Sequence, residues 1–389
     1  MIRRTRIAIA VFFAANGFVF AGWVSRIPEV QDKLDMSEGE LGLILLGMAT
    51  GLITALPLIG GVVSRYGSHR VTTVAGIAYS LILPFLSLAP APLILFGVLF
   101  MFGIMTGFMD ISMNAQAVLL EKMHGKSIMS SFHAAFSVGG MSGAVLSSGL
   151  IALKFTILPH LILMAAISAL SLLYLSRYLV VDKPSPEQDS GPVFSLPPRA
   201  LLPIGIIAAC STIGEGSMAD WSAIYLTDIV KTSASVAAIG FAAYSLMMTI
   251  GRFFGDYLIN RFKPVFMIRT AGLFAASGLA LAVLMPQTIT TILGFSMVGI
   301  GLATVIPIAF SHAGNMPNIP PGRGIAGVAT LGYSGFLAGP PLIGLVAEAT
   351  TLRASFIVVA VLFIIMASLA STLRSQQSEI HTIHDPQTV

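Results

Sequence analysis

The sequence predicts an all-α membrane protein, with twelve transmembrane helices divided between two pseudo-symmetric halves of six. Of the 389 residues, 56% are hydrophobic and only 10% are charged, whereas soluble domains carry about 25% charged residues. Twelve apolar segments are each long enough to cross a bilayer, which takes roughly 20 residues. Short motifs also recur between the first and second half of the chain at a nearly constant offset.

The apolar segments follow one another with short polar loops between them. The first begins after MIRRTR and is longer than the apolar region of a signal peptide, so we expect it to be retained as a helix. The expected spans cover about residues 5–30, 37–64, 70–89, 92–121, 127–152, 156–180, 199–228, 235–261, 264–285, 288–315, 321–349 and 352–374.

One loop is longer than the rest and divides the chain. Residues 181–198 contain Pro, Ser and charged residues, which is typical of a linker. We therefore expect an N-terminal half at residues 1–180, a cytoplasmic linker, and a C-terminal half at 199–374. Residues 375–389 are polar and are expected to form a disordered cytoplasmic tail.

The distribution of Lys and Arg predicts the orientation. With the N-terminus inside, fifteen of the 21 Lys and Arg residues fall on the inner side, five fall outside, and Arg252 lies within a span. Positively charged loops stay in the cytoplasm, so both termini are expected there, in a bacterial inner membrane. The same rule explains the pI near 9.3 without invoking nucleic acid.

Several functional classes are disfavoured by what the sequence lacks. The single Cys210 excludes an intrachain disulfide and a cysteine-based metal site. No Gly-x4-Gly-Lys-Ser/Thr motif occurs, which argues against an ATP-driven pump. No His, Glu and Cys set has the spacing of a metal site. We expect neither an enzyme nor a bound cofactor.

The two halves repeat at an offset of 196 residues. The segment Ser64–Gly67 aligns with Asn260–Lys263 at this offset. Glycines recur in the same way: Gly103 with Gly299, Gly139 with Gly335, and Gly143 with Gly339. The two tryptophans, Trp23 and Trp221, lie 198 residues apart. Parallel six-helix repeats are one known design of secondary transporters, with the substrate bound between the halves near the midplane.

The turn Gly60-Gly-Val-Val-Ser-Arg65-Tyr-Gly67-Ser-His-Arg70 resembles the G-x-L-a-D-R-x-G-R-R signature of the major facilitator superfamily. It departs at the acidic position, which is Ser64 here and Asn260 in the second copy. Asp256 is the candidate to supply that carboxylate in the second copy. The resemblance covers essentially the whole chain and implies that Arg65 and Arg261 belong to cytoplasmic gates.

A narrower resemblance rests on three segments. Trp23–Pro28, Asp110–Asn114 and Phe132–Gly140 are similar to the branch that contains MosC and YbjJ, which is akin to the fucose permease group. This resemblance implies a proton-coupled carrier for a sugar-like, polyol or amino-polyol solute.

Polar residues inside apolar segments are the candidate site. Asp110 and Asn114 are four residues apart and share one face of their helix. A carboxylate in a poorly hydrated cavity can bind and release a proton near neutral pH, as coupling to a proton gradient requires. His133 could relay a proton or bind a substrate hydroxyl. For all three, a structural hydrogen bond to a neighbouring helix is the alternative.

The seventh span carries two acids. Glu215 is near mid-membrane and flanked by glycines, and it is the second candidate for proton coupling and substrate binding. Asp220, five residues further, faces another direction at 100° per residue. It is expected to pair with Arg26 across an outer gate, because the two lie at similar depth.

Aromatic and amide residues are expected to contact the substrate. Aromatic rings can stack on a sugar, although interfacial aromatic belts are the alternative explanation. These candidates are Asn16, Trp23, Trp221, Tyr225 and Tyr333.

Arg252 and Asp256 are four residues apart in the eighth span, so we expect an ion pair that is mainly structural, with a further role in cytoplasmic gating.

The sequence as a whole therefore predicts a monomeric secondary transporter in the lipid bilayer. Its partners are a small-molecule solute and protons, and its halves alternate between inward-open and outward-open states. We favour import by proton symport. The alternatives are a proton-coupled exporter of amphipathic compounds and a membrane receptor that binds a ligand without moving it.

Overall fold

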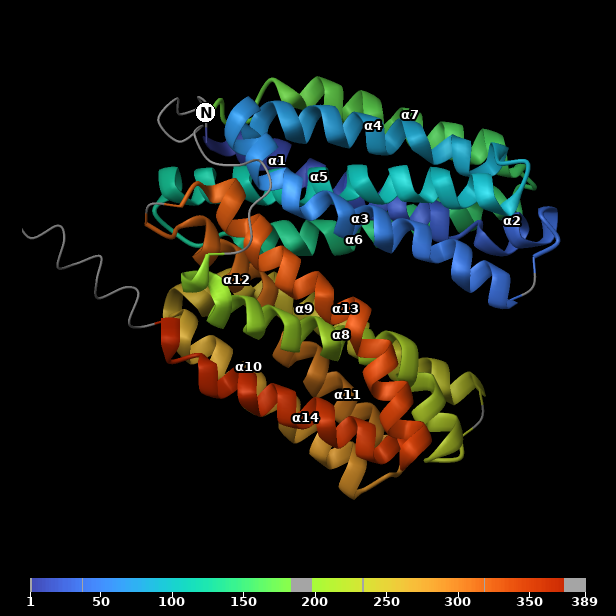
Figure 1. The fold of residues 1–389 in the computed structure, drawn as a ribbon, viewed down its shortest axis with the longest axis vertical. Helices are drawn as coiled ribbons and strands as arrows, with labels where there is room; N and C mark the ends of the chain where they lie inside the picture. Colours follow the sequence, from blue (N-terminus) through green and yellow to red (C-terminus); the bar gives the residue numbers. More distant parts are fainter. Residues whose placement is uncertain (1, 37, 183–197, 233, 318, 374–389) are drawn as a thin grey trace, which may run out of the picture. The chain divides into compact units, whose positions relative to one another are not determined.

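The computed structural model describes residues 2–36, 38–182, 198–232, 234–317 and 319–373, and within them the secondary structure is entirely helical. Figure 1 shows long helices joined by short turns. The all-α fold class expected from the low charge content is confirmed. The predicted linker falls outside the described residues except for 181, 182 and 198, and the predicted tail falls outside them entirely.

The chain forms two compact units. The first comprises Met1–Leu196 with the short segment Ile319–Ala326, and the second comprises Pro197–Asn318 with Gly327–Val389. The helices of the first unit are α1 (Ile2–Val24), α2 (Ile27–Lys33), α3 (Glu38–Tyr66), α4 (Ser68–Leu88), α5 (Pro92–His124), α6 (Met129–Ala152) and α7 (Ile157–Ser176).

The second unit begins with a 3₁₀ turn at Arg199–Leu201. Its helices are α8 (Leu202–Asp228), α9 (Ala234–Phe262), α10 (Pro264–Leu284), α11 (Thr288–Leu302), α12 (Val305–Gly314), α13 (Pro321–Ala349) and α14 (Leu352–Leu369). The first turns of α13 group with the first unit and the rest with the second.

The helices correspond to the expected spans, with two local differences. The first expected span ends as α1 at Val24, and a separate short helix, α2, follows with a proline in its first turn. The tenth expected span is interrupted at Ala303 and Thr304, which separate α11 from α12. Within the described residues, eleven helical segments are long and apolar enough to cross a membrane. The remaining long helix, α9, has 29 residues and carries Arg252, Asp256 and Arg261.

Glycines allow close helix approach in the first unit. A Cβ atom at Gly139 in α6 would collide with the backbone of Ala14 in α1, and one at Gly143 would lie 2.7 Å from the carbonyl oxygen of Phe18. Only a residue without a side chain permits this spacing. In the same way, Gly103 in α5 lies against the backbone of Met48 in α3.

The second unit repeats these contacts. A Cβ atom at Gly335 in α13 would lie 2.7 Å from the carbonyl oxygen of Ala209 in α8. Gly299 in α11 lies against the backbone of Tyr244 in α9, and Tyr244 is 196 residues after Met48. The turns that lead into α4 and α10 also match, since Gly67 and Lys263 both have positive φ, at 84° and 67°. The sequence repeat is thus also a repeat of helix contacts.

Candidate functional site

Three of the expected polar residues form a continuous chain in the first unit. The amide nitrogen of Asn114 donates to the backbone oxygen of Asp110 at 2.8 Å and lies 3.3 Å from the Asp110 carboxylate. The amide oxygen of Asn114 lies 3.3 Å from Nε2 of His133. Asn114 is fully buried, and Asp110 and His133 are partly buried. The contacts join a carboxylate, an amide and an imidazole in that order.

Two contacts fix this chain in place. The carboxylate of Glu121, at the end of α5, accepts hydrogen bonds from the backbone N–H groups of Ile128 and Met129 at 2.8 and 3.0 Å. This holds the start of α6 against the end of α5, and therefore sets where His133 meets Asn114. Phe13 of α1 meets the His133 ring edge-to-face, with the ring centroids 5.4 Å apart. The buried Asn16 lies one turn further along α1.

Glu215 of α8 faces a cation of the neighbouring helix α9. Its carboxylate Oε2 lies 4.0 Å from the guanidinium of Arg252, and both side chains are largely buried at 17% and 12% exposure. Arg252 thus reaches across to α8, and the ion pair expected between Arg252 and Asp256 on α9 stays a prediction. A buried carboxylate is costly unless a charge of opposite sign compensates it.

Arg26 has its partners within the first unit. Only 1% of its surface is exposed, and it donates to the backbone oxygen of Phe155 at 2.8 Å and to Nδ1 of His160 at 2.6 Å. It forms a further ion pair with Glu29. The expected pairing of Arg26 with Asp220, which lies in the second unit, stays a prediction. Asp220 is exposed on α8.

The aromatic candidates separate into buried and accessible residues. Tyr225 is fully buried: its hydroxyl donates to the backbone oxygen of Ala282 at 3.0 Å, and its ring stacks on Phe356 with centroids 4.6 Å apart. Its expected role in substrate binding is therefore corrected to core packing. Trp23 is also buried, with 2% of its surface exposed.

The other two aromatic candidates keep an accessible surface. Trp221 is half-buried, and its indole N–H is buried without a hydrogen-bond partner among the described residues. Tyr333 is half-buried on α13, with its ring facing that of Phe336 at a centroid distance of 6.4 Å.

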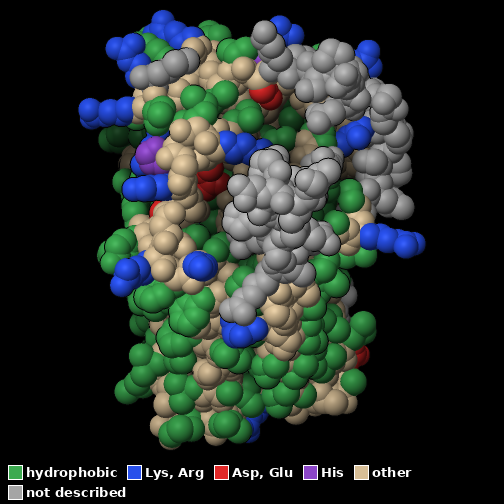
Figure 2. Space-filling view, turned by 90° about the vertical axis from the view of Figure 1, so that its left-hand side faces the viewer, with side chains coloured by type: hydrophobic (Ala, Val, Ile, Leu, Met, Phe, Trp, Pro, Cys, Tyr) green, Lys and Arg blue, Asp and Glu red, His purple; other side chains and the backbone are tan. Residues whose placement is uncertain are grey.

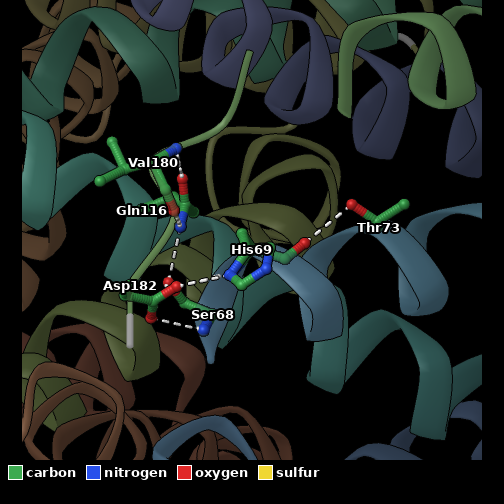
Figure 3. A network of polar contacts seen from close by, with 6 residues as sticks. All are labelled: Ser68, His69, Thr73, Gln116, Val180 and Asp182. Atoms are coloured by element: carbon green, nitrogen blue, oxygen red, sulfur yellow. Dashed lines mark hydrogen bonds and ion pairs between the residues drawn. The ribbon is translucent and has the colours of Figure 1, made fainter. Parts of the chain in front are cut away.

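Figure 3 shows a polar network at the start of α4 that sequence reasoning missed. The Asp182 carboxylate accepts hydrogen bonds from the backbone N–H and hydroxyl of Ser68, at 2.6 and 2.7 Å, and lies 2.9 Å from Nδ1 of His69. Gln116 of α5 donates to the hydroxyl of Ser68 and to the backbone oxygen of Val180. The network ties the chain after α7 to α4 and α5.

This network supplies a carboxylate to the turn whose expected acidic position is Ser64. Negative charge at a helix N-terminus is favourable because the unpaired N–H groups there carry partial positive charge. Burial alone would raise the pKa of Asp182, but hydrogen bonds from the His69 and Ser68 side chains and from both backbone N–H groups hold that pKa below its ordinary value. In the second copy, the side chain of Asn260 donates to the backbone oxygen of Asp256.

The remaining gate candidates lie at helix ends. Arg65 is exposed at the end of α3, with its guanidinium 5.7 Å from the ring centroid of Tyr66. Arg261 is exposed at the end of α9. Among the described residues, no group of three or more His, Cys, Asp or Glu side chains could hold a metal ion.

Two helical units that repeat the same glycine contacts, with polar groups joined inside their apolar helices, define a membrane carrier built by duplication. The family model described as Major Facilitator Superfamily matches residues 7–321. The chain therefore belongs to the major facilitator superfamily, whose members are transporters and not enzymes.

Curated relatives agree with this assignment. The chain is 35% identical to an uncharacterized MFS-type transporter of Yersinia pestis over 94% of both chains. It is 35% identical to an uncharacterized transporter of Sinorhizobium fredii, covering 94% of this chain and 97% of the relative. It is 32% identical to the membrane protein MosC of Rhizobium meliloti, covering 91% of this chain and 86% of MosC. The resemblance to the MosC branch is thus confirmed.

Solved structures share the fold. FucP in its outward conformation matches with a TM-score of 0.76 at 14% identity, covering 94% of this chain and 98% of FucP. The human organic anion transporter MFSD10 matches with a TM-score of 0.77 at 15% identity, covering 95% of this chain and 99% of that one.

Proposed function

We propose that this transporter imports a small polar solute, of the sugar, polyol or amino-polyol class, by symport with protons. The observation that carries the proposal is the hydrogen-bonded chain of Asp110, Asn114 and His133 within one membrane-spanning unit. Ionisable groups are costly within a bilayer, by about 2.5–3.5 kcal/mol each at the centre, and mark ion or substrate pathways.

The geometry suits reversible protonation. When Asp110 is ionised, the N–H₂ group of Asn114 can donate to it, and the amide oxygen then faces His133. When Asp110 takes up a proton, its O–H becomes a donor that a solute hydroxyl can accept. Asn114 itself neither gains nor loses a proton near neutral pH. Its role is to hold the carboxylate and the imidazole at a fixed separation, so that protonation of one changes the hydrogen bonding of the other.

In the second half, we propose that Glu215 acts as an acid whose charge is balanced by Arg252. Arg252 neutralises Glu215 in the resting state, and we propose that solute or proton binding at Glu215 competes with this ion pair. Trp221 offers an unpartnered indole N–H to a solute oxygen. Asn16 and Tyr333 are proposed as further contacts.

Orientation and assembly are proposed on the same basis. The face shown in Figure 2 carries many Lys and Arg side chains and few acidic ones, as expected for the cytoplasmic side. We propose a monomer in the bacterial inner membrane, with both termini and the 181–198 linker in the cytoplasm. One solved structure that shares the fold is the Escherichia coli fucose:proton symporter FucP, which supports the proposal of a proton-coupled carrier.

The experiment is solute-dependent proton movement in proteoliposomes that contain a trapped pH dye. A panel of sugars, polyols, amino sugars and amphipathic cations is first screened by thermal shift of the purified protein. Addition of a stabilising polar solute outside should acidify the lumen if symport occurs. Alkalinisation on addition would indicate exchange against protons, as in an exporter. Binding without proton flux or solute counterflow would contradict transport and favour a receptor.

A further inference from the structure

A groove in the second unit lies apart from the polar residues described above. It has a volume of about 530 Å³ and lies among α9, α10 and the end of α11. Its lining includes Leu258 of α9, Met267 and Phe274 of α10, and Ile300 of α11. Phe274 and Ile300 are 41% and 39% exposed, so the groove is open on the surface of membrane-spanning helices.

The groove is apolar despite its hydroxyl groups. Thr270 and Ser277 line it, but each hydroxyl donates within its own helix, to the backbone oxygens of Phe266 and Leu273 at 2.9 and 2.8 Å. They therefore present little unsatisfied polarity to an occupant. An open apolar groove of this kind can accommodate a hydrocarbon chain. Lipid hydrocarbon chains are the solvent around membrane helices.

One end of the groove is cationic. The turn between α9 and α10 lies there, and its residue Lys263 directly precedes α10, four residues before the lining residue Met267. Arg269 precedes Leu273 by four residues in the same way, and Arg261 follows Leu258 by three on α9. All three cations are exposed, and residues 258–274 contain no Asp or Glu.

From this arrangement we infer that the groove is a binding site for an anionic phospholipid. One acyl chain lies between α9 and α10, and the phosphate is held at the cationic turn. The turn meets α10 at the first residue of a membrane span, which is the depth of lipid headgroups. Basic pockets between transmembrane helices recognise such headgroups, and each Lys or Arg contributes about 1 kcal/mol near an anionic surface.

The test uses the full-length protein in a neutral detergent. Phosphatidylglycerol and phosphatidylcholine with identical acyl chains are titrated, and the Tm and lipid-bound mass are measured. Phosphatidylglycerol should raise the Tm more at equal concentration, because binding to the folded state stabilises it. Lys263→Asn should weaken phosphatidylglycerol binding about fivefold, with little change for phosphatidylcholine. Asn is chosen because it tolerates the positive φ of this position.

Two further variants sharpen the result. Lys231→Asn is the matched control, because Lys231 is an exposed lysine with φ of 62° in the loop before α9 and should leave lipid binding unchanged. Ser277→Phe fills the groove from an exposed position and should weaken both lipids. Equal responses to the two lipids in the wild type, or an unchanged preference in Lys263→Asn, would overturn the inference. A Tm shift from glycerol phosphate alone that equals the shift from phosphatidylglycerol would also overturn it. So would the appearance of a dimer mass that is lost in Ser277→Phe.

Discussion

At the scale of single residues, buried charges are placed where the protein supplies several partners at once. Arg26 reaches His160, Glu29 and the backbone of Phe155. Nδ1 of His160 accepts from Arg26, so this imidazole is neutral and Nε2 carries its proton, facing Ser147 at 3.0 Å. The cluster joins the end of α1 to α6 and α7. It is a structural element of the first unit.

Replacing Arg26 by Leu should strongly destabilise the protein. The change leaves Nδ1 of the buried His160 without its donor, and removing one partner of a buried charged cluster costs on the order of 3 kcal/mol. Thermal unfolding of the purified variant should show a clear drop in Tm. The exposed Arg65→Leu is the control and should change the Tm little. Equal Tm values for wild type and Arg26→Leu would show that the cluster contributes nothing to stability.

The Asp182 network makes a second prediction at this scale. Because the folded-state pKa of Asp182 is lowered, its contribution to stability is present above the ordinary aspartate pKa and disappears as pH falls through the lower folded value. Asp182→Asn should therefore lower the free energy of unfolding at neutral pH by roughly 1 kcal/mol, the cost of a lost helix cap. The Tm at neutral pH should fall accordingly. The Tm difference from the wild type should shrink in acid. Asp228→Asn, at an exposed site, is the control; a difference that grows in acid would contradict the assignment.

At the scale of elements, glycines decide how closely the helices approach. Gly139 faces the backbone of Ala14 across the α1–α6 contact, whereas Gly149 in the same helix has no atom within 4 Å of a Cβ position. The sequence distinguishes Gly139 only by its repeat at an offset of 196 residues. It could not show which helix each glycine meets, because that depends on tertiary structure.

Gly139→Ala and Gly149→Ala therefore form a matched pair on α6. The first should lower the Tm and the yield of folded protein, because the new methyl group forces α1 and α6 apart. The second should be neutral or slightly stabilising, since Gly costs about 0.5–1 kcal/mol in a helix interior. Both are measured by size-exclusion chromatography and thermal unfolding. Similar losses in the two variants would show that helix flexibility, and not close approach, is the reason for Gly139.

The i,i+4 spacing rule predicts contacts within a helix but not contacts between helices. Asp110 and Asn114 are in contact as the spacing predicts. Arg252 and Asp256 have the same spacing, and Arg252 also lies against Glu215 on α8. Spacing states only that a contact on one helix is possible; a buried charge on a neighbouring helix competes with it. Likewise, the contact of Asp182 with Ser68 spans 114 residues, and no local pattern could have indicated it.

At the scale of the whole molecule, composition alone predicted a helical membrane protein, and the repeat predicted its duplication. Equivalent glycines contact equivalent helices in each unit, while the polar chain has no counterpart, because the offset of 196 maps Asp110 to Ile306 and His133 to Ala329. The scaffold is symmetric and the chemistry is not. We therefore expect proton coupling to depend mainly on the first half, with the Glu215–Arg252 pair as its counterpart in the second.

That expectation is tested most directly by comparing two transport modes of one variant, Asp110→Asn, in proteoliposomes. Asparagine keeps the size and much of the hydrogen bonding of the side chain but cannot take up a proton. The account predicts that solute accumulation driven by a pH gradient is lost, while energy-independent counterflow continues at a rate near that of the wild type. Accumulation that persists unchanged in Asp110→Asn would contradict the account.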